Sequence, residues 1–225
     1  MKFKILTLLL VVLLSSCKKD ESKIFFGYNY FGLTEGNFIE YNAIAIRHNI
    51  DLIPKHDTTR YRLKTVVGKD YIDNEGRTAK EFNRYIYDEI DQEWDFLDLY
   101  TAIINEGKAE LVEENQRKIK LVFAIRDDKV WDANAYSMNN EKLCSYMPSA
   151  IHQERKYGSQ IFDSTVVVDL GYDSTFYSFK REFEVYANGV GLVELYRKDL
   201  KITGDTLNAN GGNELFLKVI DFGIE

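Results

Sequence analysis

Residues 59–67 read TRYRLKTVV, and this stretch decides the class of fold. Tyr61, Leu63 and Thr65 alternate with residues that are mostly basic, so one face of the segment is apolar and the other is charged. A period of two residues is typical of a half-buried strand in an antiparallel sheet. The pattern therefore predicts a β-strand at this position.

Strand-like segments continue on both sides of this stretch. They cover residues 41–46, 78–87, 94–104, 109–113, 118–125, 161–168, 176–187, 191–202 and 214–220. The chain holds 15 Tyr and 14 Phe but two prolines, and Gly, Asn and Asp separate the segments, with hairpin turns expected at 73–76, 188–192 and 210–213. We expect an all-β, mainly antiparallel fold: a curved sheet, sandwich or barrel, in one domain over residues 24–225. We expect at most one or two short helices in this fold, and residues 81–90 and 139–154 are the candidates.

The first 16 residues have the features of a bacterial signal peptide. Lys2 and Lys4 supply positive charge, and an apolar run follows from Ile5 to Leu14. That run is shorter than the roughly 20 residues that a membrane-spanning helix needs. The segment therefore predicts export from the cytoplasm rather than a membrane crossing.

The end of the apolar run resembles the lipobox that lipoprotein signal peptidase recognises. It reads Leu14-Ser15-Ser16-Cys17, which makes Cys17 the expected lipid-carrying first residue of the mature protein. Residues 17–23 then form a charged tether similar to the signals that direct Bacteroidetes-type lipoproteins to the cell surface. We expect a lipid anchor in the outer membrane, with the periplasmic face and the cell surface both open.

Composition limits the partners of the mature chain. The net charge of -7 becomes -9 when the two lysines of the signal peptide are removed, so nucleic acid is not an expected partner. The lipid, rather than a basic patch, is expected to hold the chain at the membrane. Cys144 is the remaining thiol, and a small buried side chain is its expected role.

Several stretches resemble one uncharacterised family of Bacteroidetes-type outer-membrane lipoproteins. The opening Tyr30 to Tyr41, with its pattern Gly36-x-Phe38-x-x-Tyr41, and the later segment GVGLV at 189–193 carry the resemblance. Segments 61–67, 73–77, 113–123 and 131–136 follow in the same order between them. The resemblance implies a lipoprotein with an all-β domain and implies no catalytic residues.

No catalytic or metal-binding constellation is predicted. His48, His56 and His152 lack a second ligand at metal-binding spacing, and Cys144 with His152 lacks a recognisable nucleophile turn. The acidic run 88–98 lacks the interior glycine of a calcium loop, and 188–192 lacks the helix of a phosphate-binding loop. We therefore expect no cofactor apart from the covalent lipid at Cys17.

Four Asp-Ser/Thr sequences form a modification hypothesis. They place Thr58, Ser164, Ser174 and Thr206 after an aspartate and before a small or aliphatic residue. This resembles the acceptor sequence for O-glycosylation of exported Bacteroidetes proteins. The alternative is that these pairs initiate turns by local side-chain hydrogen bonds.

Three functions remain open at this point. The first is a non-enzymatic lipoprotein that presents a β domain to a protein or glycan partner at the cell envelope. The second is a carrier that encloses a lipid or other apolar ligand in a curved sheet or barrel. The third is a glycan hydrolase with a carboxylate pair that the sequence does not identify. An interior filled by aromatic side chains favours the first function, and a continuous apolar pocket favours the second.

Overall fold

The computed structural model describes residues 25–138 and 142–225, so the predicted signal peptide, Cys17 and the tether lie outside the described residues. The described chain forms one sheet of twelve strands with no α-helix, and all neighbours pair antiparallel. Its order is β6-β5-β4-β3-β2-β1-β12-β11-β10-β9-β8-β7, which is a meander in two halves joined where β1 pairs with β12. The prediction of an all-β domain is confirmed.

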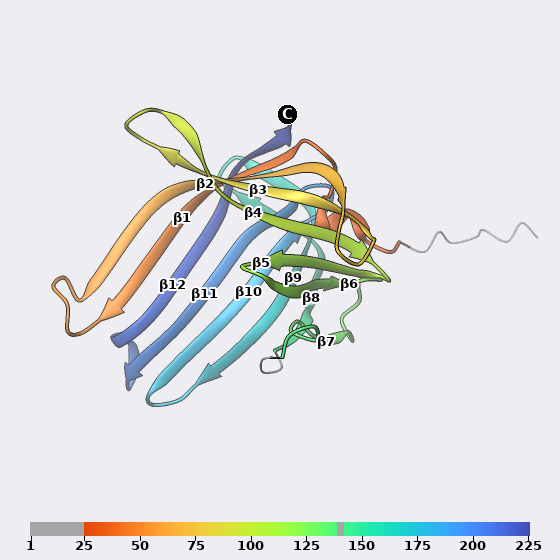
Figure 1. Ribbon diagram of the computed structural model, residues 1–225. Coiled ribbons are helices and arrows are strands. Elements are labelled where there is room, and N and C mark those ends of the chain that lie inside the picture. The colour runs from red at the N-terminus through yellow and green to blue at the C-terminus, as the bar shows by residue number, and fades with distance from the viewer. Residues whose placement is uncertain (1–24, 139–141) are drawn as a thin grey trace, which may run out of the picture.

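The strands are long enough for the sheet to curl. The first half contains β1 (Asn37–Asn49), β2 (His56–Ile72), β3 (Thr78–Asp88), β4 (Glu93–Asn105), β5 (Lys108–Glu113) and β6 (Gln116–Val122). The second half contains β7 (Val130–Asp132), β8 (Leu143–Tyr157), β9 (Gln160–Ser174), β10 (Ser178–Ala187), β11 (Gly191–Thr203) and β12 (Asp205–Ile224). Figure 1 shows β3 to β6 bending back over the face of β9 to β11. The result is a sheet nearly closed into a barrel.

The two edges of the sheet meet along a short seam. The amide of Ile119 in β6 donates to the carbonyl of Ala133 just after β7, at 2.9 Å, and the Trp131 indole donates to the Ile119 carbonyl at 3.1 Å. The Tyr146 hydroxyl of β8 donates to the Val122 carbonyl at 2.9 Å and accepts from the Val122 amide at 3.1 Å. Side chains therefore satisfy backbone groups that an edge strand leaves unpaired.

A 3₁₀-helix, Tyr28–Phe31, fills one end of the interior. Tyr30 is fully buried in a cluster with Trp131, Tyr146 and Tyr186, together with aliphatic residues of β5, β6 and β9. Gly32, which ends the helix with φ 61°, approaches the Val190 carbonyl so closely that a Cβ there would lie 2.2 Å from its oxygen. A residue with a side chain would displace the helix from the barrel.

The predicted face of residues 59–67 is confirmed. In β2, Leu63, Thr65 and Val67 point into the barrel and are between 1% and 7% exposed. Both helix candidates are strands instead, because 81–90 lies largely in β3 and 139–154 overlaps β8. Their polar residues alternate with apolar ones, so the strands bury one face.

One predicted hairpin is wrong. Residues 210–213 lie inside β12, where Gly211 and Gly212 pair with Lys201 and Leu200 of β11. The reversal occurs at Gly204, which has φ 83°. Gly212, at φ 108°, marks a close approach to the Asp199 carbonyl rather than a turn, since a Cβ there would meet that oxygen at 2.1 Å.

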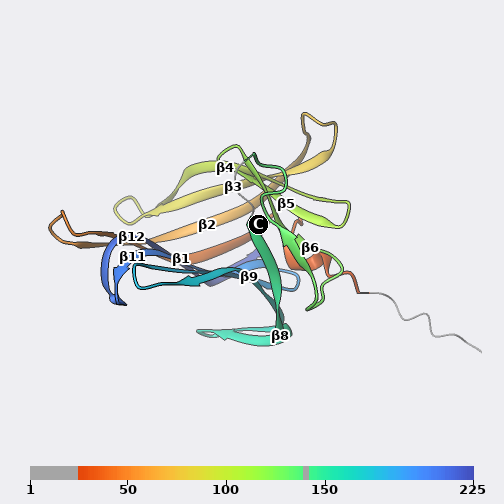
Figure 2. The same ribbon diagram turned by 90° about the horizontal axis from the view of Figure 1, so that it is seen from below.

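The outer end of the β8–β9 hairpin leaves the barrel wall. Figure 2 shows the end of the β8–β9 hairpin lying apart from the other strands when the molecule is seen from below. Phe162 packs on Phe222 of β12 at 5.2 Å, and the Tyr157 hydroxyl donates to Glu194 at 2.7 Å. This hairpin therefore covers part of the outer face of β11 and β12.

Candidate functional site: a cavity inside the barrel

A cavity of about 350 Å³ lies between the two halves of the sheet. Its size falls within the range of ordinary small-molecule sites, and it opens partly to solvent. The apolar part of its wall comes mainly from β1, β2, β11 and β12, with residues Ile39, Leu63, Val67, Leu195, Leu215 and Leu217. The inward-facing side chains therefore do not fill this part of the barrel.

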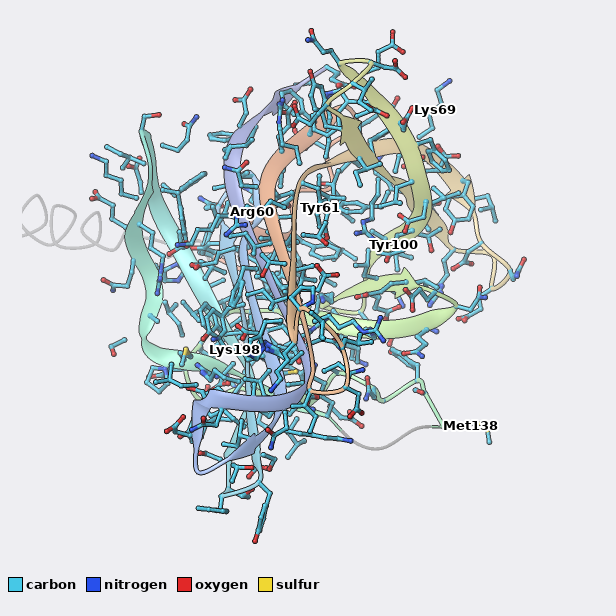
Figure 3. The ribbon with its side chains drawn as sticks, turned by 90° about the vertical axis from the view of Figure 1, so that its left-hand side faces the viewer. Arg60, Tyr61, Lys69, Tyr100, Met138 and Lys198 are labelled. Atoms are coloured by element: carbon cyan, nitrogen blue, oxygen red, sulfur yellow. The ribbon has the colours of Figure 1, made fainter. Side chains whose placement is uncertain are left out.

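Aromatic side chains frame the apolar wall. Phe31 from the 3₁₀-helix, Tyr41 from β1, Phe82 from β3 and Tyr186 from β10 all line the cavity. Figure 3 shows Tyr61 and Tyr100 within the curve of β1 to β4. The Tyr41 hydroxyl donates to the Leu192 carbonyl at 2.7 Å, and burial raises its pKa far above the usual tyrosine value. Tyr41 is therefore a neutral, fixed part of the wall.

The rest of the wall is charged. Lys120 of β6 reaches across the barrel to Glu184 of β10 at 2.5 Å, and Glu184 also accepts from the Tyr186 hydroxyl at 2.6 Å. Glu113 of β5 lies 3.5 Å from Lys120 and 3.4 Å from Lys118. These groups sit on strands that are distant in the sequence, and the curvature of the sheet brings them together.

The ion pairs hold these groups in their charged forms. Burial alone would lower the pKa of Lys120, but Glu184 and Glu113 outweigh it and raise the value above the ordinary lysine pKa. Burial alone would raise the pKa of Glu113, but Lys120 and Lys118 hold it below its usual value. Lys120 and Glu113 are therefore ionised at neutral pH.

The opening carries two arginines. Arg84 of β3 pairs with Asp98 at 3.1 Å and contacts the Tyr100 hydroxyl. Arg197 of β11 donates to Glu182 of β10 through Nε at 2.9 Å and Nη2 at 2.7 Å. The Arg197 side chain remains 41% exposed, so this end of the cavity is wet. The site is thus amphipathic: its apolar wall comes from β1, β2, β12 and Leu195 of β11, and its charged wall from β3, β5, β6, β10 and Arg197 of β11.

Sequence reasoning missed this charged wall. Lys118 and Lys120 alternate with Ile119 and Leu121, a pattern that indicates a solvated basic face. In the fold, Leu121 faces the packed cluster while Lys120 is 11% exposed, because β6 is covered on both sides. Ala109 of β5 pairs with Leu121 and the next residue, Glu110, pairs with Ile119, so the register shifts at Lys120. No local pattern signals such a shift.

The rejected metal and nucleophile candidates have other contacts. Nδ1 of His48 lies 2.8 Å from Nδ1 of His56, and His48 also contacts Glu214 at 2.9 Å. Nδ1 of His152 contacts the Tyr30 hydroxyl at 2.6 Å, and burial raises the pKa of the Cys144 thiol to about 12. Within the described ranges, no three His, Cys, Asp or Glu side chains gather where they could share a metal ion.

The four proposed acceptor hydroxyls occupy two ends of the molecule. Thr58, Ser174 and Thr206 are exposed near the tips of the β1–β2, β9–β10 and β11–β12 hairpins, which share one rim of the sheet in Figure 1. Ser164 lies at the opposite end, half-buried, with its hydroxyl 2.6 Å from the Tyr30 hydroxyl. Cys17 lies outside the described residues.

The described part of the chain contains no helix with the length and hydropathy that a bilayer crossing requires. Comparison with known proteins gives no matching family model and no matching curated protein.

Two solved structures are similar over most of the chain. One, a "putative exported protein with YmcC-like fold" from Bacteroides fragilis, has a TM-score of 0.40 and 13% identity, and covers 88% of this chain and 100% of its own. The other, a "putative lipoprotein" from Parabacteroides distasonis, has a TM-score of 0.41 and 10% identity, and covers 86% of this chain and 98% of its own. Likenesses this distant assign neither a family nor a site to the chain.

Proposed function

We propose that this chain is a non-catalytic binding lipoprotein of the cell envelope whose barrel interior takes up a small, partly apolar ligand. The observation that carries the proposal is the cavity of about 350 Å³ between the halves of the sheet. A barrel whose core existed for stability alone would be filled at crystal-like density. Here the aliphatic side chains Leu63, Leu195 and Leu217 belong to one cluster and still border open space on their inward side.

The anchor is part of the same proposal. The sequence Leu14-Ser15-Ser16-Cys17 supports lipidation at Cys17 and a position at the outer membrane, on a face that stays open. A charge of -7 disfavours binding to nucleic acid and to anionic lipid headgroups. The lipid tether would hold the cavity close to the membrane, where apolar ligands are available.

The charges in the cavity do not favour a hydrolase. Acid-base hydrolysis of a glycan needs one carboxyl group that is protonated near neutral pH. Glu184 accepts hydrogen bonds from Lys120 and Tyr186. The pKa of Glu113 is lowered, because the charges of Lys120 and Lys118 outweigh the effect of burial. Glu113 is therefore unsuited to donate a proton to a leaving group at neutral pH.

A second candidate function is presentation of the outer face to a protein or glycan. Phe183, Tyr196 and Phe216 follow one another across β10, β11 and β12, with Phe183 and Tyr196 stacked at 5.0 Å and 7°. Lys198 lies 5.5 Å from the Phe216 ring centre. Aromatic and cationic side chains in one row are typical of contact surfaces.

The test of the cavity is native mass spectrometry of the full chain purified from its own envelope, followed by denaturing extraction. We expect a co-purifying small molecule in near-stoichiometric amount. A protein mass without any ligand would contradict the proposal.

A cavity-filling variant locates the ligand. Leu217→Phe puts additional volume into the cavity, so we expect the bound molecule to be lost. Leu143→Phe is the matched control, because Leu143 is 56% exposed and does not line the cavity. Loss of ligand in the control as well would place binding elsewhere and favour the outer-face alternative.

A further inference from the structure

The charged wall of the cavity belongs to a larger network inside the barrel. Lys142 pairs with Glu182 at 2.6 Å, and Glu182 also accepts from Arg197 at 2.7 Å. The charge of Arg197 also acts on Glu113, which Lys118 and Lys120 flank. Lys120 then connects to Glu184. The network therefore runs from Lys142, directly before β8, through β10 and β11 to β5 and β6.

The network has one positive charge too many. It contains four cations, Lys118, Lys120, Lys142 and Arg197, and three carboxylates, Glu113, Glu182 and Glu184. Arg84 is already balanced by Asp98. The excess of one cation contrasts with the net charge of -7 of the whole chain. An unbalanced charge in a partly desolvated site is unfavourable and attracts a counter-charge.

Glu182 and Glu184 are buried and already accept from two residues each, whereas Lys118 and Arg197 are partly exposed toward the cavity. Glu184 is 1% exposed and Glu182 is 5% exposed, and each accepts from two donors. Arg197 uses Nε and Nη2 for Glu182, so its Nη1 is not engaged by that carboxylate. Lys118 is 30% exposed, and among the residues that the structure describes its one ion pair is with Glu113 at 3.4 Å.

Glu114 does not supply the missing negative charge. It lies beside the cavity in the turn between β5 and β6, where it is exposed. Within the described residues, no ion pair joins it to Lys118 or Arg197. Because its side chain is exposed, water weakens its charge relative to those of the buried carboxylates Glu182 and Glu184.

We propose that the ligand of the cavity is a monoanionic amphiphile, whose anionic group binds between Lys118 and Arg197 and whose apolar body lies against Leu195 and Leu217. This inference rests on the proposed function and gives its ligand a charge class. The anion completes the network to four negative and four positive groups. Charge-assisted hydrogen bonds from a lysine and an arginine discriminate an anion from a neutral molecule of equal length.

The test compares three ligands that share one chain and differ in the head group. Octanoate, octanol and octyltrimethylammonium are measured by equilibrium dialysis against the full chain in lipid nanodiscs, with empty nanodiscs as the blank. We expect octanoate to bind at least about tenfold more tightly than octanol, and the cation more weakly than either.

The outcomes separate the two levels of the argument. If none of the three ligands binds above the blank, the proposed function fails. If octanol binds as tightly as octanoate, or the cation binds best, the cavity binds ligands but the anionic class is wrong. Tighter binding of octanoate supports both the proposed function and the anionic class of the ligand.

Variants then assign the preference to the named groups. Lys118→Gln should reduce octanoate binding toward that of octanol while leaving octanol unchanged, and Lys118→Arg should retain the preference. Lys69→Gln is the matched control, since Lys69 is exposed on β2 and does not line the cavity. An octanoate preference that survives Lys118→Gln would overturn the assignment of Lys118.

Discussion

The barrel has two interiors that are built differently, although both are enclosed by the same sheet. Near the 3₁₀-helix, Tyr30, Leu121 and Tyr146 are fully buried and belong to one continuous cluster. Against β11 and β12, Leu195 and Leu217 border the cavity. Aromatic residues are abundant in both places, so composition does not distinguish them. The two regions differ in whether side chains from the facing strands reach the centre of the barrel and fill it.

The largest expected difference concerns leucine truncation. Leu121→Ala removes a side chain that is 0% exposed in the packed interior, so it should cost about 3–4 kcal/mol through lost burial plus a new void. Leu217→Ala enlarges a cavity that already exists and should cost about 1–2 kcal/mol. Urea unfolding of both variants measures the difference. Equal costs would mean that the cavity is closed by side-chain rearrangement.

The seam of the barrel gives the next effect. Tyr146→Phe keeps the ring but leaves the amide and carbonyl of Val122 without their hydroxyl partner. Buried backbone groups without partners cost about 1–3 kcal/mol, so the free energy of unfolding should fall by that amount.

Tyr172→Phe is the control for the seam, because Tyr172 is 66% exposed and its hydroxyl contributes no bond to the seam. It should leave the free energy of unfolding unchanged. A Tyr146→Phe protein as stable as this control would show that water replaces the hydroxyl and that the seam is open.

The difference between the two interiors also explains what could be predicted from the sequence. The all-β fold followed from alternation, as at Leu63 and Thr65, because a period of two is a local property of the chain. The cavity depends on how far β3 to β6 bend over β10, which no segment encodes by itself. Lys120 and Glu184 are 64 residues apart, and their pairing exists because of that bend.

The turn at residues 210–213 was mispredicted for a related reason. Two glycines between polar residues are typical of a hairpin loop. In β12, however, Gly212 permits close contact with β11, and the register shifts beside Gly211. The same residue type serves a turn or a close approach, and the neighbouring strand decides between them.

The ion pairs of the hollow interior predict a limited pH range of stability. The pKa values of Glu113 and Glu182 are lowered in the fold, since neighbouring cations outweigh burial, so their stabilisation is present above about pH 4.5 and is lost on acidification. The pKa of Lys120 is raised, so its contribution is lost as pH rises above the ordinary lysine value of 10.5. Urea midpoints from pH 3 to 11 should therefore form a plateau that falls at both ends.

Glu113→Gln tests the acidic side of this plateau. The variant removes one of the groups whose protonation destabilises the fold, so its midpoint should fall less between pH 6 and pH 3 than that of the parent chain. A midpoint that rises on acidification of the parent chain would contradict the pKa direction of both carboxylates.

The smallest expected effect comes from two identical triplets on one strand. Asp163-Ser164-Thr165 lies within β9 and Asp173-Ser174-Thr175 spans its last two residues and the one after them, and both fit the proposed acceptor sequence for O-glycosylation. Ser164 contacts Tyr30 in the packed interior, so Ser164→Ala should lower the free energy of unfolding by about 1 kcal/mol, whereas the exposed Ser174→Ala should change it by no more than about 0.5 kcal/mol.

The intact mass of the protein purified from its envelope should decrease by one glycan in Ser174→Ala and by none in Ser164→Ala. A parent chain whose mass equals that of the polypeptide plus lipid would end the modification hypothesis. Because an acceptor must be exposed to reach a transferase, a glycan on Ser164 would mean that the packed end of the barrel opens.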